Sequence, residues 1–183
     1  MKGEYDVVII GGGPIGSIAS LLLEAKGLSV ALIERNTVPY PFPRAIALNG
    51  FSMGLVKDLI GPELWSEFEF TPGIHVGYVL NKDKMDEPFG LMQPPVIEGK
   101  ILDNDSFGFL NWFNQPQLEG LLRRSIEDRD GITTLYGHEA LVLWEDDLNF
   151  VRVQELSTGE SFDISGKYLL GADGGGSLSL IHI

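Results

Sequence analysis

The sequence predicts an α/β fold that combines a parallel sheet, an antiparallel meander and part of a second β-rich unit. Two continuous apolar, β-branched runs, Tyr5–Ile10 and Ser29–Ile33, flank a segment with helical periodicity. Such runs are typical of parallel strands buried on both faces, and a helix between two of them indicates a βαβ unit. Short runs bounded by turn residues fill much of the later chain, as expected for antiparallel strands.

A glycine-rich turn and a helix directly follow the first strand. The turn is Gly11–Gly16 (GGGPIG), and apolar residues recur at helical spacing from Pro14 to Lys26. Gly27 supplies a stop for this helix, and the second apolar strand leads into Glu34. The order of strand, glycine turn, helix, strand and acid is typical of a Rossmann-like dinucleotide-binding unit.

The spacing of the glycines gives each of them a physical role. Gly11 would make the tight turn, Gly13 would let a pyrophosphate approach the backbone, and Gly16 would let helix and strand pack closely. Pro14 and Ile15 open the helix, whose N-terminus would face the phosphates. The alternative is a glycine-rich turn without a ligand, and the motif alone does not separate FAD from NAD.

The acid after the second strand is suitably placed to bind a ribose. In dinucleotide-binding units, a carboxylate roughly 20 residues after the glycine turn accepts hydrogen bonds from the adenosine ribose hydroxyls. Glu34 lies close to this distance from Gly11. Its charge would repel a 2′-phosphate, so a free 2′-hydroxyl is favoured. Arg35, the next residue, leaves the 2′-phosphate as an alternative.

Composition excludes several classes of function. The 183 residues carry 26 acidic and 13 basic side chains, a formal charge of −13, which argues against nucleic acid as a partner. There is no cysteine for disulfides or thiolate chemistry, and the three scattered histidines make no metal motif. Without these groups, we expect the chemistry of the protein to need a cofactor. No apolar run is long enough for a membrane span, and we expect a cytoplasmic protein.

The middle of the chain predicts an extended segment, a helix and a small sheet. Prolines within Val38–Arg44 (VPYPFPR) impose the extended segment. A helix could start near Leu48 and end at Gly61-Pro62. Short strands are predicted at Ile74–Leu80, Phe89–Ile97 and Ile101–Phe109, and the polar stretch Asn81–Glu87 is interpreted as a solvated hairpin tip.

The last third of the chain returns to the first sheet. A helix opens at Gln115-Pro116 and ends around residues 129–131, and Ile132–Leu135 is predicted as the third parallel strand. The predicted meander and the strand that follows it are Glu139–Trp144, Phe150–Leu156, Ser161–Ile164 and Lys167–Gly171. Because ligands bind beyond the carboxyl ends of strands in open α/β sheets, Asp173 and Gly174 are candidate binding residues.

Several separated motifs together resemble one family. They are the GGGPIG turn with Glu34-Arg35, Pro43-Arg44-Ala45, Asn114-Gln115-Pro116 with Leu118-Glu119, and Gly171-Ala172-Asp173-Gly174. The chain resembles the N-terminal part of a class A FAD-dependent aromatic monooxygenase, of the p-hydroxybenzoate hydroxylase-like group. The sequence YPFPRAI at residues 40–46 is similar to the 3-(3-hydroxyphenyl)propionate hydroxylase and polyketide hydroxylase branch.

The resemblance implies further cofactor-binding residues. Arg44 would contact the FAD pyrophosphate or ribityl region, Gln115 would lie along the ribityl chain beneath the flavin, and Ala140 would meet the adenine through its backbone. Asp173-Gly174 would serve FAD and, indirectly, the nicotinamide nucleotide. On the residues alone, Arg44 could equally be a solvated arginine and Gln115 a polar helix start. The full predicted cofactor-binding set is Gly11, Gly13, Pro14, Ile15, Gly16, Glu34, Arg35, Arg44, Gln115, Ala140, Asp173 and Gly174.

The resemblance also implies a reaction. NADH or NADPH would reduce FAD, and the reduced flavin would use O2 to hydroxylate a small aromatic or phenolic substrate. Because the cofactor carries the chemistry, no catalytic residue is assigned, and His75 in the predicted substrate sheet is interpreted as structural. The alternatives are another flavoprotein on this scaffold, such as a halogenase or a reductase, and a non-catalytic dinucleotide-binding fragment.

The resemblance divides the chain into an incomplete FAD-binding domain, residues 1–73 and 111–177, and a partial substrate-domain sheet, residues 74–110. The family pattern continues to a serine, here Ser177, and then to an arginine, where this chain has Leu180. The last six residues, Leu178–Ile183, read LSLIHI. The same six residues result from translating CTGTCTCTTATACACATC, the mosaic end of a transposase-based sequencing adapter. We therefore predict a non-native tail at 178–183 on the N-terminal part of a longer protein; a genuine apolar terminal strand is the alternative.

Overall fold

The computed structural model describes residues 3–42, 44–73, 77–81, 84–92, 96–97, 100–101 and 110–175. The chain forms two compact units, one made of Met1–Pro43 with Gln115–Ile183 and the other of Arg44–Asn114. The predicted functional boundaries at residues 73 and 111 stay a prediction. His75, Ser177, the predicted tail 178–183 and residues 102–109 of a predicted strand lie outside the described residues.

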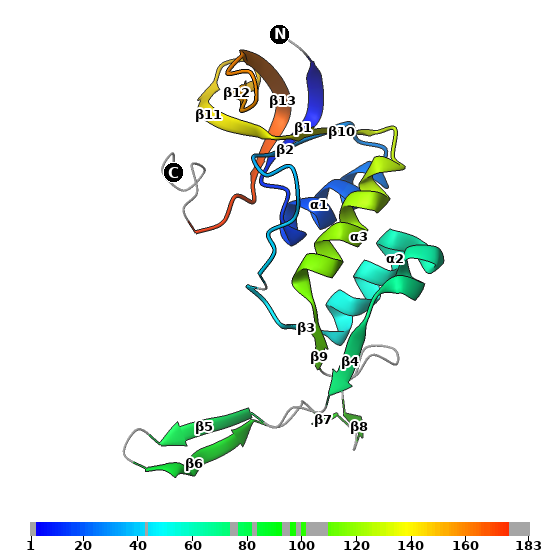
Figure 1. The fold of residues 1–183 in the computed structure, drawn as a ribbon, viewed down its shortest axis with the longest axis vertical. Coiled ribbons are helices and arrows are strands. Elements are labelled where there is room, and N and C mark those ends of the chain that lie inside the picture. The colour runs from blue at the N-terminus through cyan, green and yellow to red at the C-terminus, as the bar shows by residue number, and fades with distance from the viewer. Residues whose placement is uncertain are drawn as a thin grey trace. The chain divides into compact units, whose positions relative to one another are not determined.

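The first unit is built on a six-stranded mixed sheet with the order β10-β2-β1-β13-β12-β11 (Figure 1). β10, β2, β1 and β13 pair in parallel, whereas β11, β12 and β13 form an antiparallel meander. The elements of this unit are β1 (Glu4–Ile10), α1 (Pro14–Glu24), β2 (Val30–Glu34), α3 (Gln115–Glu127), β10 (Ile132–Tyr136), β11 (His138–Glu145), β12 (Asn149–Glu155) and β13 (Ser161–Gly171). The predicted parallel sheet and meander are confirmed.

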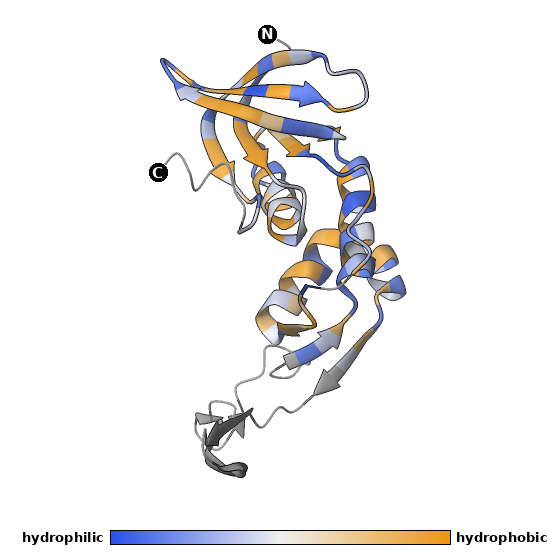
Figure 2. Ribbon diagram, turned by 60° about the vertical axis from the view of Figure 1, so that its left-hand side comes forward, coloured by the Kyte–Doolittle hydropathy of each residue, from blue (hydrophilic) through white to orange (hydrophobic). Residues whose placement is uncertain are grey.

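Both faces of the sheet are buried at its parallel strands β1 and β2, over Val7–Ile10 and Val30–Ile33. One face packs into an apolar cluster made of Val8, Ile10, Ala31, Ile33, Val151, Val153 and Ile164. Alternate residues of β1 and β2 point to the opposite face, where α1 contacts the strands and its Leu21 is fully buried. Figure 2 shows apolar residues continuing along these strands. Burial on two faces explains why the strands appear in the sequence as unbroken apolar runs.

One boundary in the meander differs from the prediction. The sequence predicts two strands separated at Ser165-Gly166, but β13 continues through both residues. A Cβ atom at Gly166 would lie 2.9 Å from Cγ2 and 3.2 Å from the backbone nitrogen of Val8 in β1. The glycine therefore allows β13 to pass close to β1, rather than ending the strand.

The second unit contains α2 (Gly50–Glu67) and an antiparallel sheet of β3 (Ala47–Asn49), β9 (Leu110–Phe113) and β4 (Phe70–Gly73). The side-chain oxygen of Asn49 caps α2 by accepting a hydrogen bond from the Ser52 amide at 2.8 Å. Gly61 has a φ of 78° before Pro62 and kinks the helix there, so the predicted break is confirmed. Within the described ranges, neither this helix nor any other is long and apolar enough to cross a membrane.

Two hairpins also belong to this unit. β5 (Gly77–Asn81) pairs with β6 (Lys84–Met92), and β7 (Val96–Ile97) pairs with β8 (Lys100–Ile101). The predicted hairpin is confirmed, but β6 begins inside the stretch predicted as its tip, and the predicted strand 89–97 is divided between β6 and β7. The hydrogen bonds of an antiparallel pair join backbone groups, so a polar sequence is compatible with a strand here.

Candidate functional site

The glycine turn begins with a backbone conformation that favours glycine. Gly11 has a φ of 101°, and its amide donates a hydrogen bond to the carbonyl of Ile33 at 2.8 Å. A Cβ atom at this position would collide with the backbone of Ala172 and lie 2.7 Å from the amide nitrogen of Asp173. Both the turn itself and the neighbouring segment therefore exclude a side chain here.

The other two glycines of the motif differ from each other in their surroundings. A Cβ atom at Gly16 would collide with the carbonyl oxygen of Gly11 and lie 3.4 Å from the Ile9 side chain. Close packing of α1 on the turn and strand, as predicted for Gly16, is thus observed. Around Gly13 nothing lies within 4 Å of such an atom, which leaves open space beside the backbone.

The first turn of α1 has free hydrogen-bonding capacity. Pro14 opens the helix and Gly13 is its N-cap, and no described side chain caps it or places an acid in its first turn. Ile15 in this turn is 71% exposed. The first amides of a helix lack intrahelical acceptors and carry the positive end of the helix dipole. An anion beside Gly13 would therefore meet favourable partners.

The carboxylate of Glu34 is fixed directly over the glycine turn. One oxygen, Oε2, accepts a hydrogen bond from the Gly12 amide at 2.8 Å. The other, Oε1, accepts from the backbone amide of Asn36 at 2.8 Å and from its Nδ2 at 2.6 Å. An ionised carboxylate has about four acceptor positions, so these three bonds leave one for a ligand hydroxyl.

A pocket of about 510 Å³ opens beside the carboxyl ends of β2 and β10. It is lined by Arg35, Asn36, Thr37, Val38, Pro39, Tyr40, Pro41, Tyr136, Gly137, Glu155, Leu156 and Ser157. Arg35 is exposed at this pocket. Burial raises the pKa of Tyr136, whose hydroxyl has no hydrogen-bond partner among the described residues. The predicted residue Arg35 thus has access to a cavity at the strand ends, the usual place for ligands in such sheets.

The segment after β13 lies against the glycine turn. The amide of Ala172 donates a hydrogen bond to the carbonyl of Ile10 at 2.7 Å, and Gly174 has a φ of 83°. Asp173 therefore lies next to Gly11 although more than half of the chain separates them in sequence. The structure brings two of the predicted motifs together, while the cofactor roles of Asp173 and Gly174 stay predictions.

Ala140 lies in the meander at an irregular position. The register of β11 with β12 shifts between Ala140 and Val142, as in a β-bulge. The Ala140 side chain packs against the apolar cluster of the sheet. Its side chain has a structural role, and the predicted backbone contact with an adenine stays a prediction.

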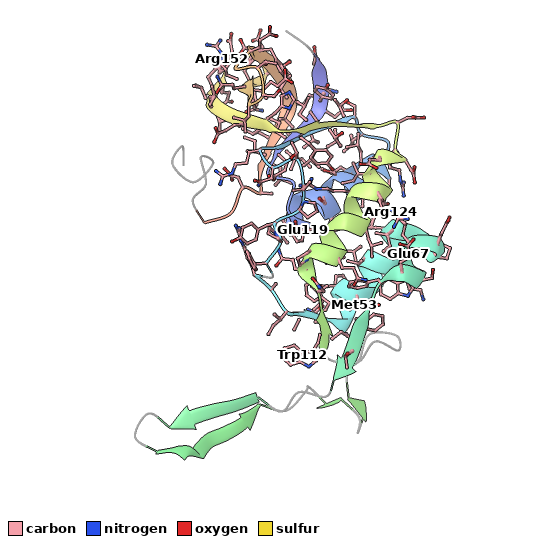
Figure 3. All side chains as sticks on the ribbon, in the orientation of Figure 1. Met53, Glu67, Trp112, Glu119, Arg124 and Arg152 are labelled. Carbon is pink, nitrogen blue, oxygen red and sulfur yellow. The ribbon has the colours of Figure 1, made fainter. Side chains whose placement is uncertain are left out.

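Gln115 is directed at a neighbour on its own helix. Its Nε2 donates a hydrogen bond to Oε1 of Glu119 at 2.7 Å, and the two residues are 7% and 5% exposed. Figure 3 labels Glu119 on α3, one helical turn from the start of that helix. This contact orients the Gln115 amide with its Nε2 toward Glu119. The predicted contact with the ribityl chain is not tested by this geometry.

Arg44 belongs to the second unit, where it is exposed in the segment that leads to β3. Its predicted contact with the cofactor stays a prediction. The structure also adds residues outside the predicted cofactor-binding set, namely Gly12, Asn36, Glu119 and Arg123. Gly12 and Glu119 belong to motifs quoted from the sequence, and Glu119 lies four positions after Gln115, where side chains meet on a helix. Asn36 and Arg123 left no such signal.

Comparisons with known proteins identify the family of this chain. The chain matches the family described as FAD binding domain over residues 4–180. It is 29% identical over 182 residues to 3-(3-hydroxy-phenyl)propionate/3-hydroxycinnamic acid hydroxylase 1 of Burkholderia vietnamiensis, covering 95% of this chain and 26% of that protein. It is 30% identical over 188 residues to the probable NADH-specific resorcinol 4-hydroxylase of Rhodococcus jostii, covering 95% of this chain and 31% of that protein.

Solved structures give the same answer for the fold. The chain is similar to the flavin-dependent monooxygenase PieE in complex with FAD and substrate, with 26% identity and a TM-score of 0.73. This similarity covers 97% of the present chain and 31% of PieE. The chain spans about a quarter to a third of the length of the relatives that it matches. The predicted Rossmann-like fold is confirmed.

Proposed function

The chain belongs to the FAD-binding domain family, and from this premise we propose that its glycine turn, α1 and Glu34 hold the adenosine diphosphate part of FAD. One observation carries the proposal. The Glu34 carboxylate is held over the turn by three hydrogen bonds and keeps one acceptor position for a ribose hydroxyl. Beside it, the open space at Gly13 and the uncapped start of α1 fit a pyrophosphate.

Each of these residues would have a distinct part in binding. The backbone at Gly13, with the amides of the first turn of α1, would donate hydrogen bonds to phosphate oxygens. Pro14 has no amide hydrogen to donate, but at the first helical position it costs the helix no hydrogen bond of its own. The remaining predicted ligands, Arg35, Arg44, Gln115, Ala140, Asp173 and Gly174, complete the proposed site.

The reaction that we propose is hydroxylation of an aromatic or phenolic compound with NADH or NADPH and O2. The names of the Burkholderia and Rhodococcus relatives, both hydroxylases of phenolic compounds, support it. FAD, when bound, supplies the transfer of electrons and the activation of oxygen. The residues of this chain bind and orient the cofactor. A cytoplasmic location is part of the same proposal, because nicotinamide nucleotides are cytoplasmic metabolites.

The visible spectrum of the complete protein tests this function. The whole open reading frame at the locus would be expressed, and its spectrum recorded before and after adding NADH or NADPH with a panel of phenols. We expect bound flavin whose absorbance is bleached faster in the presence of one phenol. A colourless protein that also fails to bind added FAD would contradict the proposed function.

A further inference from the structure

Arg123 is a buried charged residue on a face of α3 that also carries the buried polar residues Gln115 and Glu119. It lies in α3 and is only 8% exposed, and Leu122 and Ile126 nearby on the same helix are also buried. Burying a guanidinium is unfavourable unless hydrogen bonds compensate for the lost water. The partners of this side chain therefore indicate what it does.

The guanidinium of Arg123 binds the backbone that follows β2. Its Nη1 donates a hydrogen bond to the Thr37 carbonyl at 2.8 Å, and its Nη2 donates to the Asn36 carbonyl at 3.4 Å. Its Cζ also lies 4.4 Å from the centre of the Tyr136 ring, a distance typical of a cation–π contact. One side chain from α3 thus holds a loop and a strand end.

Two of these partners, Asn36 and Tyr136, are also neighbours of Glu34. Asn36, which accepts a hydrogen bond from Arg123, donates two hydrogen bonds to the Glu34 carboxylate. Tyr136, which lies under the guanidinium, is the residue of β10 whose Cα pairs with that of Glu34 in β2. Arg123 makes no direct contact with Glu34, but it holds its neighbours on two sides.

We propose that Arg123 is a positioning residue for the adenosine of the cofactor, which keeps the Glu34 carboxylate in place for the ribose hydroxyls. The inference rests on the proposed function of Glu34. Arginine suits this role because its planar fork reaches two carbonyls while its face stacks on a ring. A lysine at this position would offer one ammonium and could not satisfy both carbonyls with the same geometry.

The test compares two nucleotides and two arginines. The nucleotides are ADP and 2′,3′-dideoxy-ADP, which differ only in the ribose hydroxyls, and their binding to the 183-residue chain is measured by calorimetry. The variants are Arg123→Met and a control, Arg152→Met. Arg152, labelled in Figure 3, lies in β12, pairs with Asp163 at 2.8 Å and stands 5.6 Å from the Trp144 ring centre. The control therefore also removes an arginine with polar and ring contacts.

The expected readout is the ratio of the two affinities. The unchanged chain should prefer ADP over the dideoxy nucleotide about tenfold, the typical effect of one hydrogen bond to a charged group. Arg123→Met should bring this ratio close to one, whereas Arg152→Met should leave it unchanged. General loosening of the fold would weaken both nucleotides equally and would leave the ratio as it was.

Three results distinguish the possible failures. An unchanged ratio in Arg123→Met would overturn the positioning role while leaving the proposed function intact. Failure of the unchanged chain to bind either nucleotide would instead contradict the proposed function of the glycine turn. If Arg123→Met does not fold, Arg123→Lys decides on the same ratio, because it keeps the charge and the aliphatic stem but loses the fork.

Discussion

The two ends of the parallel strands carry polar residues that are used in opposite ways. At the carboxyl ends, the Glu34 carboxylate keeps an acceptor position, the first turn of α1 lacks a side-chain cap among the described residues, and space remains beside Gly13. Hydrogen-bonding capacity that the fold does not use is available to a ligand. We therefore propose that this end of the sheet serves binding.

At the amino ends, polar groups satisfy one another. Asp6 in β1 accepts hydrogen bonds from the amide and the hydroxyl of Ser29, both at 2.9 Å, and from Nζ of Lys167 in β13 at 2.7 Å. The Asp6 amide returns a hydrogen bond to the Ser29 hydroxyl at 2.9 Å. This cluster ties three chain segments together and serves stability. The two ends therefore differ in unused hydrogen-bonding capacity rather than in polarity, and this difference supports the proposed binding at the carboxyl end.

Two glycine substitutions should separate packing from binding at the carboxyl end. Gly16→Ala puts a methyl group against the Gly11 carbonyl, and we expect it to lower the free energy of unfolding by about 3 kcal/mol, the upper part of the range for overpacking. Gly13→Ala meets no atom within 4 Å, and the φ of Gly13, −69°, suits any residue. Its stability should stay within about 0.5 kcal/mol of the original in urea denaturation.

The binding effects of this pair should run the other way. In Gly13→Ala the added methyl group occupies the space beside the backbone where a pyrophosphate would approach, so the folded variant should lose ADP affinity in calorimetry. A stable Gly13→Ala variant that binds ADP normally would show that the phosphates lie elsewhere. Equal destabilisation by both substitutions would contradict the contrast between packed and open positions.

The charge of Glu34 can be tested separately from its contacts. Glu34→Gln keeps the shape but replaces one acceptor oxygen with a donor, so it should lower ADP affinity about tenfold or more. Removing a negative charge alone would favour an anionic ligand. Glu160→Gln, at an exposed turn before β13, is therefore the control with the same change in net charge. An affinity for ADP that is equal in both variants would show that the ribose does not use Glu34.

The sequence predicted the parallel half of the sheet because local pattern and tertiary environment agree there. The apolar runs of β1 and β2 are buried in the structure, and the glycine turn connects the first strand to α1 as expected. In the meander the prediction was wrong at Gly166, where the glycine serves contact between strands rather than a turn. A single sequence does not distinguish these two uses of glycine.

The hydrogen-bond partners of the site residues could not be predicted from the sequence, and the reason is physical. Glu34 was identified from its place after a strand, but its bonds with Gly12 and Asn36 depend on how two strand ends meet. Arg123 appears in the sequence as one of the polar positions of an amphipathic helix. In the structure it is buried and contacts the Asn36-Thr37 backbone and the Tyr136 ring. Such contacts join chain segments far apart in sequence.

The polar cluster of Asp6, Ser29 and Lys167, at the amino ends of the parallel strands, predicts an acid-sensitive contribution to stability. The hydrogen bond from Lys167, followed by those from Ser29, lowers the pKa of Asp6 from 3.8 to about 2 in the folded protein. A carboxyl whose pKa is lower when folded stabilises the fold above its unfolded pKa. This contribution is therefore complete above about pH 4 and is lost as the pH falls toward about 2.

Asp6→Asn and Lys167→Met test this contribution and should have the smallest effects of the set. Each should lower the thermal midpoint slightly at neutral pH and flatten the loss of stability as the pH falls from about 4 to about 2. Neither should change ADP affinity at neutral pH, because the cluster lies at the end of the strands away from Glu34. The same loss in both variants would identify Lys167 as the main cause of the lowered Asp6 pKa. A change in ADP binding would show instead that the two ends of the sheet are coupled.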